Sequence, residues 1–425
     1  MLSFTYKSTS NIFWSLCNCL ILIDTINGFC LTHGISFPIG QLYKFAIIIF
    51  LGSQLLKFKR GQWVVILSIC YVTLYINHLN ININPKLFFE SITLLSKFII
   101  VPWVYVYLIH LKNTTDPAFI WEKCIKCFKI NSIFICLNIY SGLLGMGSHV
   151  YQGSIGYKGY LYAVNEISGL GALLASFFIY FMYIKYHNQT KKFYLFILII
   201  IITTFLLGTK TLLIIIIAGI YYIPSITLFK LRAPKKNRLL KILILLFTLI
   251  ILIFVGYLFT AQTGMLERWT YFYNQGGIIR IIFSGRNEFW MEEKGEFFTS
   301  SFWVQLLGLG EMRTVEMDQF DVLMNYGYLG ILIIYSFYGK LLVQTFTRRK
   351  KYNISRLIFF INIFLISASC VAGHVIFSGM LGIFWGILNS MFSVPDNIVY
   401  DSITSHNKIR INNIHNTISN NSYIK

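Results

Sequence analysis

Residues 193–229, FYLFILIIIITTFLLGTKTLLIIIIAGIYYIPSITLF, decide the class of fold. Two long apolar runs, near 193–208 and 211–229, stand on either side of the segment Gly208-Thr209-Lys210-Thr211. A helix needs about 20 apolar residues to cross the hydrocarbon core of a bilayer, with a range of about 17 to 25. The two runs therefore predict a pair of membrane-spanning helices joined by a very tight turn.

The rest of the chain has the same character. Hydrophobic residues make up 56% of the sequence and charged residues 12%, whereas a soluble globular protein carries about 25% charged residues. A search for apolar runs of helical length predicts an all-α membrane protein of about 12 transmembrane helices. The candidate spans lie near 11–33, 40–57, 62–79, 87–110, 128–146, 161–184, 193–208, 211–229, 239–260, 322–345, 355–373 and 377–393.

Basic residues gather in short clusters between the apolar runs. Each cluster follows an even-numbered span, and together they hold 21 of the 36 Lys and Arg residues; they lie at 57–60, 112–129, 185–192, 230–241 and 348–356. Because cytoplasmic loops are enriched in Lys and Arg, this pattern places both termini in the cytoplasm. The +20 net charge does not indicate a nucleic-acid partner, since the cations do not share one solvated face.

The same topology predicts which segments face outward. They are 80–86, 147–160, the turn at 208–211, the long loop 261–320 and the turn near 373–379. The loop is much longer than ordinary connections, and its aromatic residues are a kind that disordered segments avoid. We expect it to fold as short helices lying on the membrane, within one polytopic domain, 1–393, that precedes a weakly ordered cytoplasmic tail, 394–425.

The predicted outer face keeps a distinctive set of cations, against the usual charge bias: Lys158, Lys210, Arg268, Arg280, Arg286 and Arg313. Arginine offers a planar fork of donors that binds phosphate or pyrophosphate at two points. An anionic lipid-linked ligand therefore fits, and Lys210 projects toward it from the tight turn at the membrane edge. The alternative interpretation is that these cations pair with the glutamates of the loop itself.

Three carboxylates, Glu316, Asp318 and Asp321, stand where the chain re-enters the bilayer. Asp318 and Asp321 share a helix face, and acidic residues at a helix start can act simply as caps. The functional interpretation is a general base or a binder of sugar hydroxyls. His374, on the last outward turn, is a further candidate for that role. No disulfide or metal site is predicted, since Cys124-x-x-Cys127 lacks a second Cys or His pair nearby.

With these motifs in order, the sequence resembles the O-antigen polymerase and ligase superfamily of bacterial envelope glycosyltransferases, by motif over roughly residues 160–335. The matching features are the many spans, the Gly-Thr-Lys-Thr turn, the run Ser284-Gly285-Arg286 through Trp290 to Gly308-x-Gly310, and the acidic stretch leading to Tyr326-Gly327-Tyr328-Leu329-Gly330. Ligases of this superfamily typically carry an Arg in the turn and a His-Asn pair before the later helix. Lys210 and Glu316 with Asp318 in those places look more like a polymerase.

The resemblance implies a GT-C-like polytopic glycosyltransferase. It would join undecaprenyl-pyrophosphate-linked oligosaccharide repeats into O-antigen or capsular polysaccharide at the periplasmic face of the bacterial inner membrane, without a metal or other cofactor. Donor and acceptor would both be lipid-linked glycans in the bilayer, and a chain-length regulator protein is a further partner this class can have. Lys210, Arg286, Arg280 and Arg313 would bind the pyrophosphate, and Asp318, Glu316 or Asp321 would accept the acceptor's proton.

Two alternatives remain at this point. A flippase or transporter of the same lipid-linked sugars would have charged residues buried at the bilayer centre, for which Asp24, Lys97 and Glu166 are candidates. The long outer loop favours an enzyme. A ligase would differ only in its acceptor.

Overall fold

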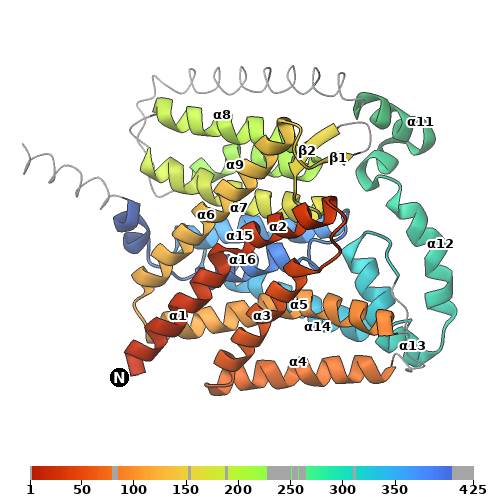
Figure 1. Ribbon diagram of the computed structural model, residues 1–425, viewed down its shortest axis with the longest axis horizontal. Helices are drawn as coiled ribbons and strands as arrows, with labels where there is room; N and C mark the ends of the chain where they lie inside the picture. Colours follow the sequence, from red (N-terminus) through yellow and green to blue (C-terminus); the bar gives the residue numbers. More distant parts are fainter. Residues whose placement is uncertain are drawn as a thin grey trace, which may run out of the picture.

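The structure is a computed structural model that describes residues 2–78, 85–151, 155–186, 190–226, 265–309 and 313–403, together with the single residues 250 and 257. The described residues are mostly helical, at 82%. Among the described residues, five helices are long and apolar enough to cross a membrane: Ser8–Thr32, Ile92–Thr114, Pro117–Leu143, Val164–Lys185 and Asp318–Arg348. The protein is therefore an all-α, multi-pass membrane protein, as predicted (Figure 1).

A helix lies at each predicted apolar segment except the one near 239–260, which lies outside the described residues apart from Ile250 and Tyr257. The first predicted span is divided at Cys19 into two helices. The bundle consists of α1 (Leu2–Asn18), α2 (Leu20–Thr32), α3 (Ile39–Leu55), α4 (Lys59–His78), α5 (Pro85–Thr114), α6 (Pro117–Leu143), α7 (Val164–Lys185), α8 (Thr190–Leu207), α9 (Lys210–Ile226), α14 (Asp318–Arg348), α15 (Asn353–Ser369) and α16 (Gly379–Ser390).

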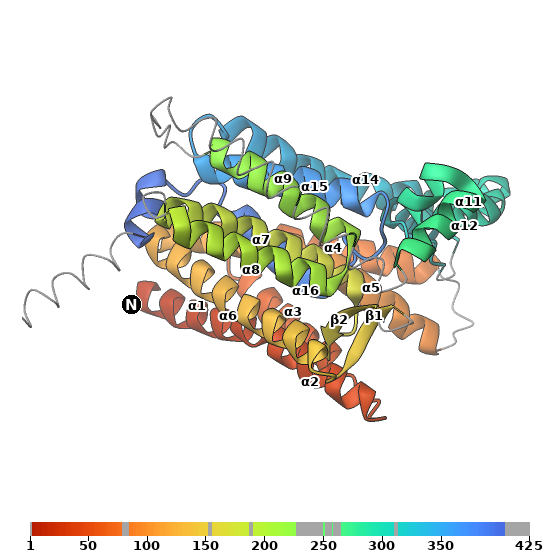
Figure 2. The ribbon, with the colours of Figure 1, turned by 90° about the horizontal axis from the view of Figure 1, so that it is seen from above.

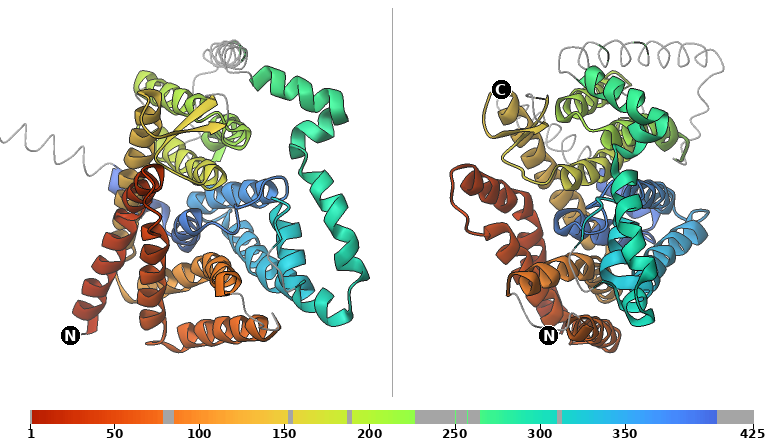
Figure 3. Two further views of the ribbon diagram at one scale, coloured as in Figure 1. Left: turned by 45° about the vertical axis from the view of Figure 1, so that its right-hand side comes forward. Right: turned by 90° about the vertical axis from the view of Figure 1, so that its right-hand side faces the viewer.

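The predicted outer loop is helical where the structure describes it. It contains α11 (Met265–Phe283), α12 (Arg286–Thr299) and α13 (Phe302–Leu307). Helices α11 and α12 form an arm beside the bundle (Figure 3). Viewed from above, this arm and a small hairpin lie at one end of the molecule, and the N-terminus lies at the other (Figure 2). We call the end that carries the arm and the hairpin the loop end.

The hairpin is an addition to the all-α expectation. Strand β1 (Ser148–Tyr151) pairs antiparallel with β2 (Ile155–Gly159), with His149 opposite Tyr157. It packs directly on the turn before α9, since a Cβ atom at Gly156 would stand only 2.7 Å from the carbonyl oxygen of Leu207. The hairpin thus fixes one side of the turn that carries Lys210.

The start of the predicted tail is helical and packed. Residues 396–403 form a short helix in which Val399 and Ile403 are buried. The indole nitrogen of Trp121 in α6 donates a hydrogen bond to Ser402 Oγ at 3.0 Å. Residues 404–425, the remainder of the predicted tail, lie outside the described residues.

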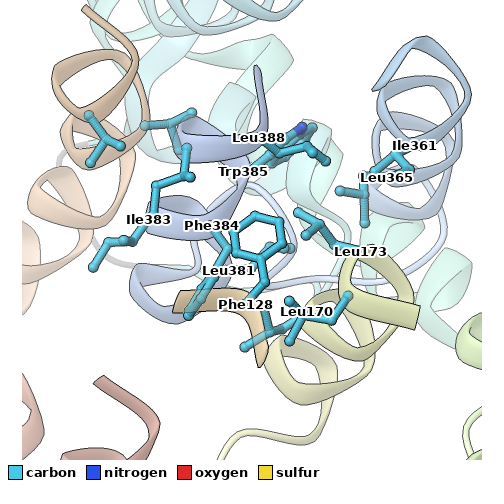
Figure 4. Packing of buried hydrophobic residues seen from close by; sticks show 14 of the residues in the cluster. Phe128, Leu170, Leu173, Ile361, Leu365, Leu381, Ile383, Phe384, Trp385 and Leu388 are labelled. Carbon is cyan, nitrogen blue, oxygen red and sulfur yellow. The ribbon is translucent and has the colours of Figure 1, made fainter. Parts of the chain in front are cut away.

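Helix α16 is the centre of the core, because every one of its residues is buried. Phe384, Trp385 and Leu388 project from it toward side chains of α6, α7 and α15 (Figure 4). Inside this core, Asn362 Oδ1 of α15 accepts a hydrogen bond from the Trp385 indole at 2.7 Å. A helix that is apolar and buried all round needs neighbours on every side, and α5, α7 and α15 supply them.

Two glycine motifs lock α13 against α14. Helix α14 is kinked at Gly327, whose φ of 62° and ψ of −165° are accessible only to glycine. A Cβ atom there would stand 2.4 Å from the carbonyl carbon of Leu306, and one at Gly308 would stand 2.2 Å from the carbonyl oxygen of Asn325. The Gly308 motif and the Tyr326-Gly327 motif therefore interlock, backbone against backbone.

This interlock predicts that Gly327→Ala destabilises the protein by about 1 to 3 kcal/mol or more, because the strained backbone conformation excludes a side chain. The measurement is the thermal unfolding of the purified protein in detergent. Gly339→Ala, in the same helix, is the control, since a Cβ atom at Gly339 meets nothing within 4 Å. Equal melting temperatures for the two variants would contradict the interlock.

Candidate functional site

Strained backbone marks one place at the loop end. Among the described residues, three that are not glycine have a left-handed φ: Ser284 at 56°, Glu316 at 60° and His374 at 66°. Each such residue costs about 1 to 3 kcal/mol, and such residues cluster at functional sites. The three residues come from distant parts of the sequence, and contacts made by them and by the residues next to them join them into one site.

Lys210 connects the tight turn to the arm. Its ammonium group donates hydrogen bonds to the carbonyl oxygen of Ile281 at 2.7 Å and to Ser284 Oγ at 3.3 Å. Ile281 lies in the last turn of α11, where carbonyl groups lack helical partners and attract cations. Lys210 therefore holds the end of α11 and the strained turn that places Arg286 at the start of α12.

Arg286 faces Glu316 across the site. Its Nε and Nη2 atoms donate to Glu316 Oε2 at 3.0 and 2.9 Å. The Glu316 side chain is 51% exposed. An ion pair this exposed contributes only about 0 to 1 kcal/mol, so a stronger anion can replace the carboxylate. We call Lys210, Ser284, Arg286, Glu316 and His374 the Arg286 site.

The other loop arginines also have glutamate partners. Arg280 pairs with Glu288, and Arg313 pairs with both Glu293 and Glu296. Arg280, Arg286 and Arg313 therefore all pair with glutamates of the loop, as the alternative interpretation of these cations expects. The side chain of Arg268 and residues 310–312, which include Gly310 and Glu311, lie outside the described residues.

The two predicted aspartates hold backbone segments. Asp318 is fully buried, and its oxygens accept the N–H groups of His374, Val375 and Ile376 at 2.6, 2.9 and 2.7 Å. Asp321 Oδ1 accepts the N–H group of Val315 at 2.6 Å. Of the three predicted carboxylates, Glu316 is the one whose side chain reaches the exposed surface.

His374 is the member of the Arg286 site that also lines a cavity of the bundle. The charges of Lys97, Glu166, Glu316 and Arg286 all act on its ring. Burial, and after it the positive charge of Lys97, lowers the pKa of His374 below its ordinary value. The ring is therefore neutral at pH 7 and can accept a proton.

Lys158 has a different setting. It lies in β2, donates to the carbonyl oxygen of Tyr162 at 3.1 Å and stands over the Tyr162 ring. The sequence analysis did not single out Lys44, which the structure places beside Asp24 in the bundle. In the described part of the chain, no three His, Cys, Asp or Glu side chains gather as a metal site requires.

Comparison with models of known protein families finds no match, and comparisons with curated proteins and with solved structures find none either. The chemistry of the Arg286 site therefore has to be argued from its own residues. Those residues are an arginine, the half-exposed carboxylate that pairs with it and a neutral histidine, all at the edge of a membrane bundle.

Asp318→Asn is predicted to destabilise the protein by about 2 to 4 kcal/mol, because the amide places an N–H donor against backbone N–H groups that need an acceptor. The measurement is the melting temperature in detergent, with protease sensitivity of the 374–376 segment as a second readout. Asp401→Asn is the control, because Asp401 is exposed. If both variants melt with the wild type, the three hydrogen bonds do not hold the loop.

Proposed function

We propose that this protein is a membrane glycosyltransferase that polymerises polyprenyl-pyrophosphate-linked oligosaccharide repeats, and that the Arg286 site carries the reaction. The observation that carries the proposal is the exposed pair between Arg286 and Glu316, held by two strained turns at the end of a membrane bundle. An arginine whose carboxylate partner is easily exchanged is a ready binding site for pyrophosphate.

The chemistry follows from charge. The anomeric carbon of the donor glycan separates from the pyrophosphate oxygen, and the leaving group gains negative charge as that bond breaks. Arg286 stabilises this charge where it develops, after the pyrophosphate has displaced Glu316. A hydroxyl oxygen of the acceptor repeat forms the new bond to the anomeric carbon, and its proton passes to His374 or to the released Glu316.

An apolar cavity offers a place for the lipid tail. It has a volume of about 370 Å³ and lies between α6, α7, α8 and α9. Leu207 and Leu212, on either side of the turn that carries Lys210, line one part of it, and Ser132 and Lys129 line another. A polyprenyl chain in this cavity has its pyrophosphate end near Lys210, beside the Arg286 site.

The proposed topology has twelve spans, both termini in the cytoplasm, and the loop end in the periplasm of a bacterial inner membrane. The positive-inside rule supports this orientation, because the clusters of Lys and Arg follow the even-numbered spans. Arg348 ends α14, whereas the Arg286 site lies against the start of that helix. The cationic cluster and the site are thus separated by the length of α14.

A flippase for the same lipid-linked sugars is the second candidate. The observation in its favour is that Asp24 and Glu166 are buried in the bundle beside Lys44 and Lys97. The two functions differ in what accumulates when the protein is missing. Loss of a polymerase leaves single repeats on lipid in the outer leaflet, and loss of a flippase leaves them in the cytoplasmic leaflet.

The first functional prediction concerns Arg286. A deletion strain rescued with Arg286→Ala should carry single lipid-linked repeats and lack the polysaccharide ladder, because losing one charge-stabilising donor costs about 100-fold or more in rate. Lys210→Ala should give the same phenotype, because Lys210 positions the turn before Arg286. The measurement is gel electrophoresis of surface polysaccharide, with protein levels checked by immunoblot.

Arg348→Ala is the matched control, since Arg348 is exposed and lies at the far end of α14. It should restore the full ladder. A full ladder from the Arg286→Ala strain would refute the role of this site. Full-length polymer that is not attached to its final acceptor would identify a ligase instead.

The second functional prediction concerns His374. If its neutral ring is the base, polymerase activity in membranes should fall only at a pH below the ordinary histidine pKa of about 6.5, because burial lowers the pKa at which the ring takes up a proton. His374→Gln should lose about 100-fold in activity at neutral pH and should lack this acid limb. If His374→Gln keeps its activity and the acid limb of the profile, the base is Glu316.

A further inference from the structure

A second, polar cavity lies inside the bundle next to His374. Its volume is about 430 Å³, within the range of about 300 to 1,000 Å³ found for small-molecule sites. Residues of α2, α3, α5, α7 and the start of α16 line it. The charged lining residues are Asp24, Lys44, Lys97 and Glu166, with His374 beside them. Nothing in the function proposed above uses this cavity.

The charges in the cavity form two pairs. Lys44 Nζ lies 2.7 Å from Asp24 Oδ1, and Lys97 Nζ lies 3.5 Å from Glu166 Oε1. The second oxygen of Glu166 accepts a hydrogen bond from Ser378 Oγ at 2.8 Å. The second oxygen of Asp24 is buried and accepts no hydrogen bond from the described residues.

Gly379 lets the two lysines come together. A Cβ atom at Gly379 would stand 3.0 Å from Lys44 Cδ and 3.7 Å from Lys97 Cγ, so both lysine stems pass over the start of α16. The lysine side chains are 20% and 28% exposed, whereas their partners Asp24 and Glu166 are 9% and 8% exposed. The ammonium groups thus face the cavity in front of buried carboxylates.

This arrangement favours a neutral ligand rich in hydroxyl groups. Two cations balance two anions, so the cavity has no excess positive charge to attract phosphate. It offers alternating donors and acceptors, and a sugar hydroxyl both donates and accepts. Uncharged polar side chains add further partners around the wall: Asn27, Gln41, Thr93, Ser96 and Tyr162. The Asp24 oxygen without a partner is an acceptor that such a ligand can satisfy.

We propose that this cavity binds a saccharide, and that its occupant is the terminal sugar of the acceptor repeat. This assignment of the occupant rests on the function proposed above. His374 supports it by position, because it lines the cavity and also feels the charges of Arg286 and Glu316. A sugar in the cavity therefore presents a hydroxyl group toward the site where the pyrophosphate leaves.

The test is protection of a single cysteine in the purified full-length protein. The accessible cysteines, namely Cys19, Cys30, Cys70, Cys136 and Cys370, are first replaced by serine. Ser96→Cys then places a thiol on the cavity wall, and Ser301→Cys, on the exposed surface before α13, is the matched control. A water-soluble maleimide labels each variant in the presence of a chosen probe.

Two probes are compared: the free repeat oligosaccharide, released by mild acid from the lipid of the deletion strain, and inorganic pyrophosphate. We expect the oligosaccharide to slow labelling of Ser96→Cys at least fivefold and to leave Ser301→Cys unchanged. Pyrophosphate should leave both unchanged. Protection by pyrophosphate alone would make the cavity an anion site, and protection by neither would make the ion pairs purely structural; each result overturns the proposal.

A second variant ties the protection to the charged lining. Lys97→Gln, added to Ser96→Cys, should raise the half-protecting oligosaccharide concentration about tenfold, because a charged donor to the sugar is replaced by a shorter, neutral amide. Unchanged protection would exclude Lys97 from the binding site. The experiment involves no polymerisation. A full ladder from the Arg286→Ala strain would therefore overturn the role of the Arg286 site alone, and absent protection together with the predicted ladder defect would overturn the saccharide pocket alone.

Discussion

Burial of α16 on every side is the constraint on which the rest of the structure depends. A helix without access to water must find protein partners for the polar groups at both of its ends. At its start, Ser378 caps Leu381 and donates to Glu166, and Asp318 accepts the amides of the segment just before it. At its end, Lys112 Nζ donates to the carbonyl oxygen of Ser390 at 2.7 Å. Carboxylates at the start and a cation at the end also match the helix dipole.

The same constraint explains why charged residues gather at the loop end. Asp318 of α14 and Glu166 of α7 both accept hydrogen bonds from residues at or just before the start of α16. Lys97 of α5 in turn pairs with Glu166. Asp318 and Glu316 are only two residues apart. Asp318 is buried and accepts three backbone N–H groups, whereas Glu316 is half exposed beside Arg286. Neighbouring carboxylates thus serve different purposes: Asp318 holds the loop, and Glu316, in the proposed function, gives way to the pyrophosphate.

The sequence predicted the helices because their signal is local. A run of apolar residues of the right length becomes a helix wherever it lies, so the segments that became α3, α7 and α15 were placed within a few residues. The hairpin at 148–159 was missed, because its glycines and its packing on Leu207 depend on distant residues. Lys210 was expected at the membrane edge, but its partners Ile281 and Ser284 lie far along the chain. The sequence likewise could not identify Glu316 as the partner of Arg286, because the two residues meet only when the loop packs against the start of α14.

The packing of α16 favours the proposed enzyme over a flippase. A transporter must carry its sugar from one end of the bundle to the other, past whatever lies beneath the polar cavity. Beneath the cavity lies the body of α16, where Phe384 and Trp385 are fully buried against three other helices (Figure 4). The Trp385 indole is also fixed by its hydrogen bond to Asn362, so moving it would break both packing and a buried polar contact. The cavity at the start of α16 therefore fits the proposed reaction at the loop end better than passage of a sugar through the bundle.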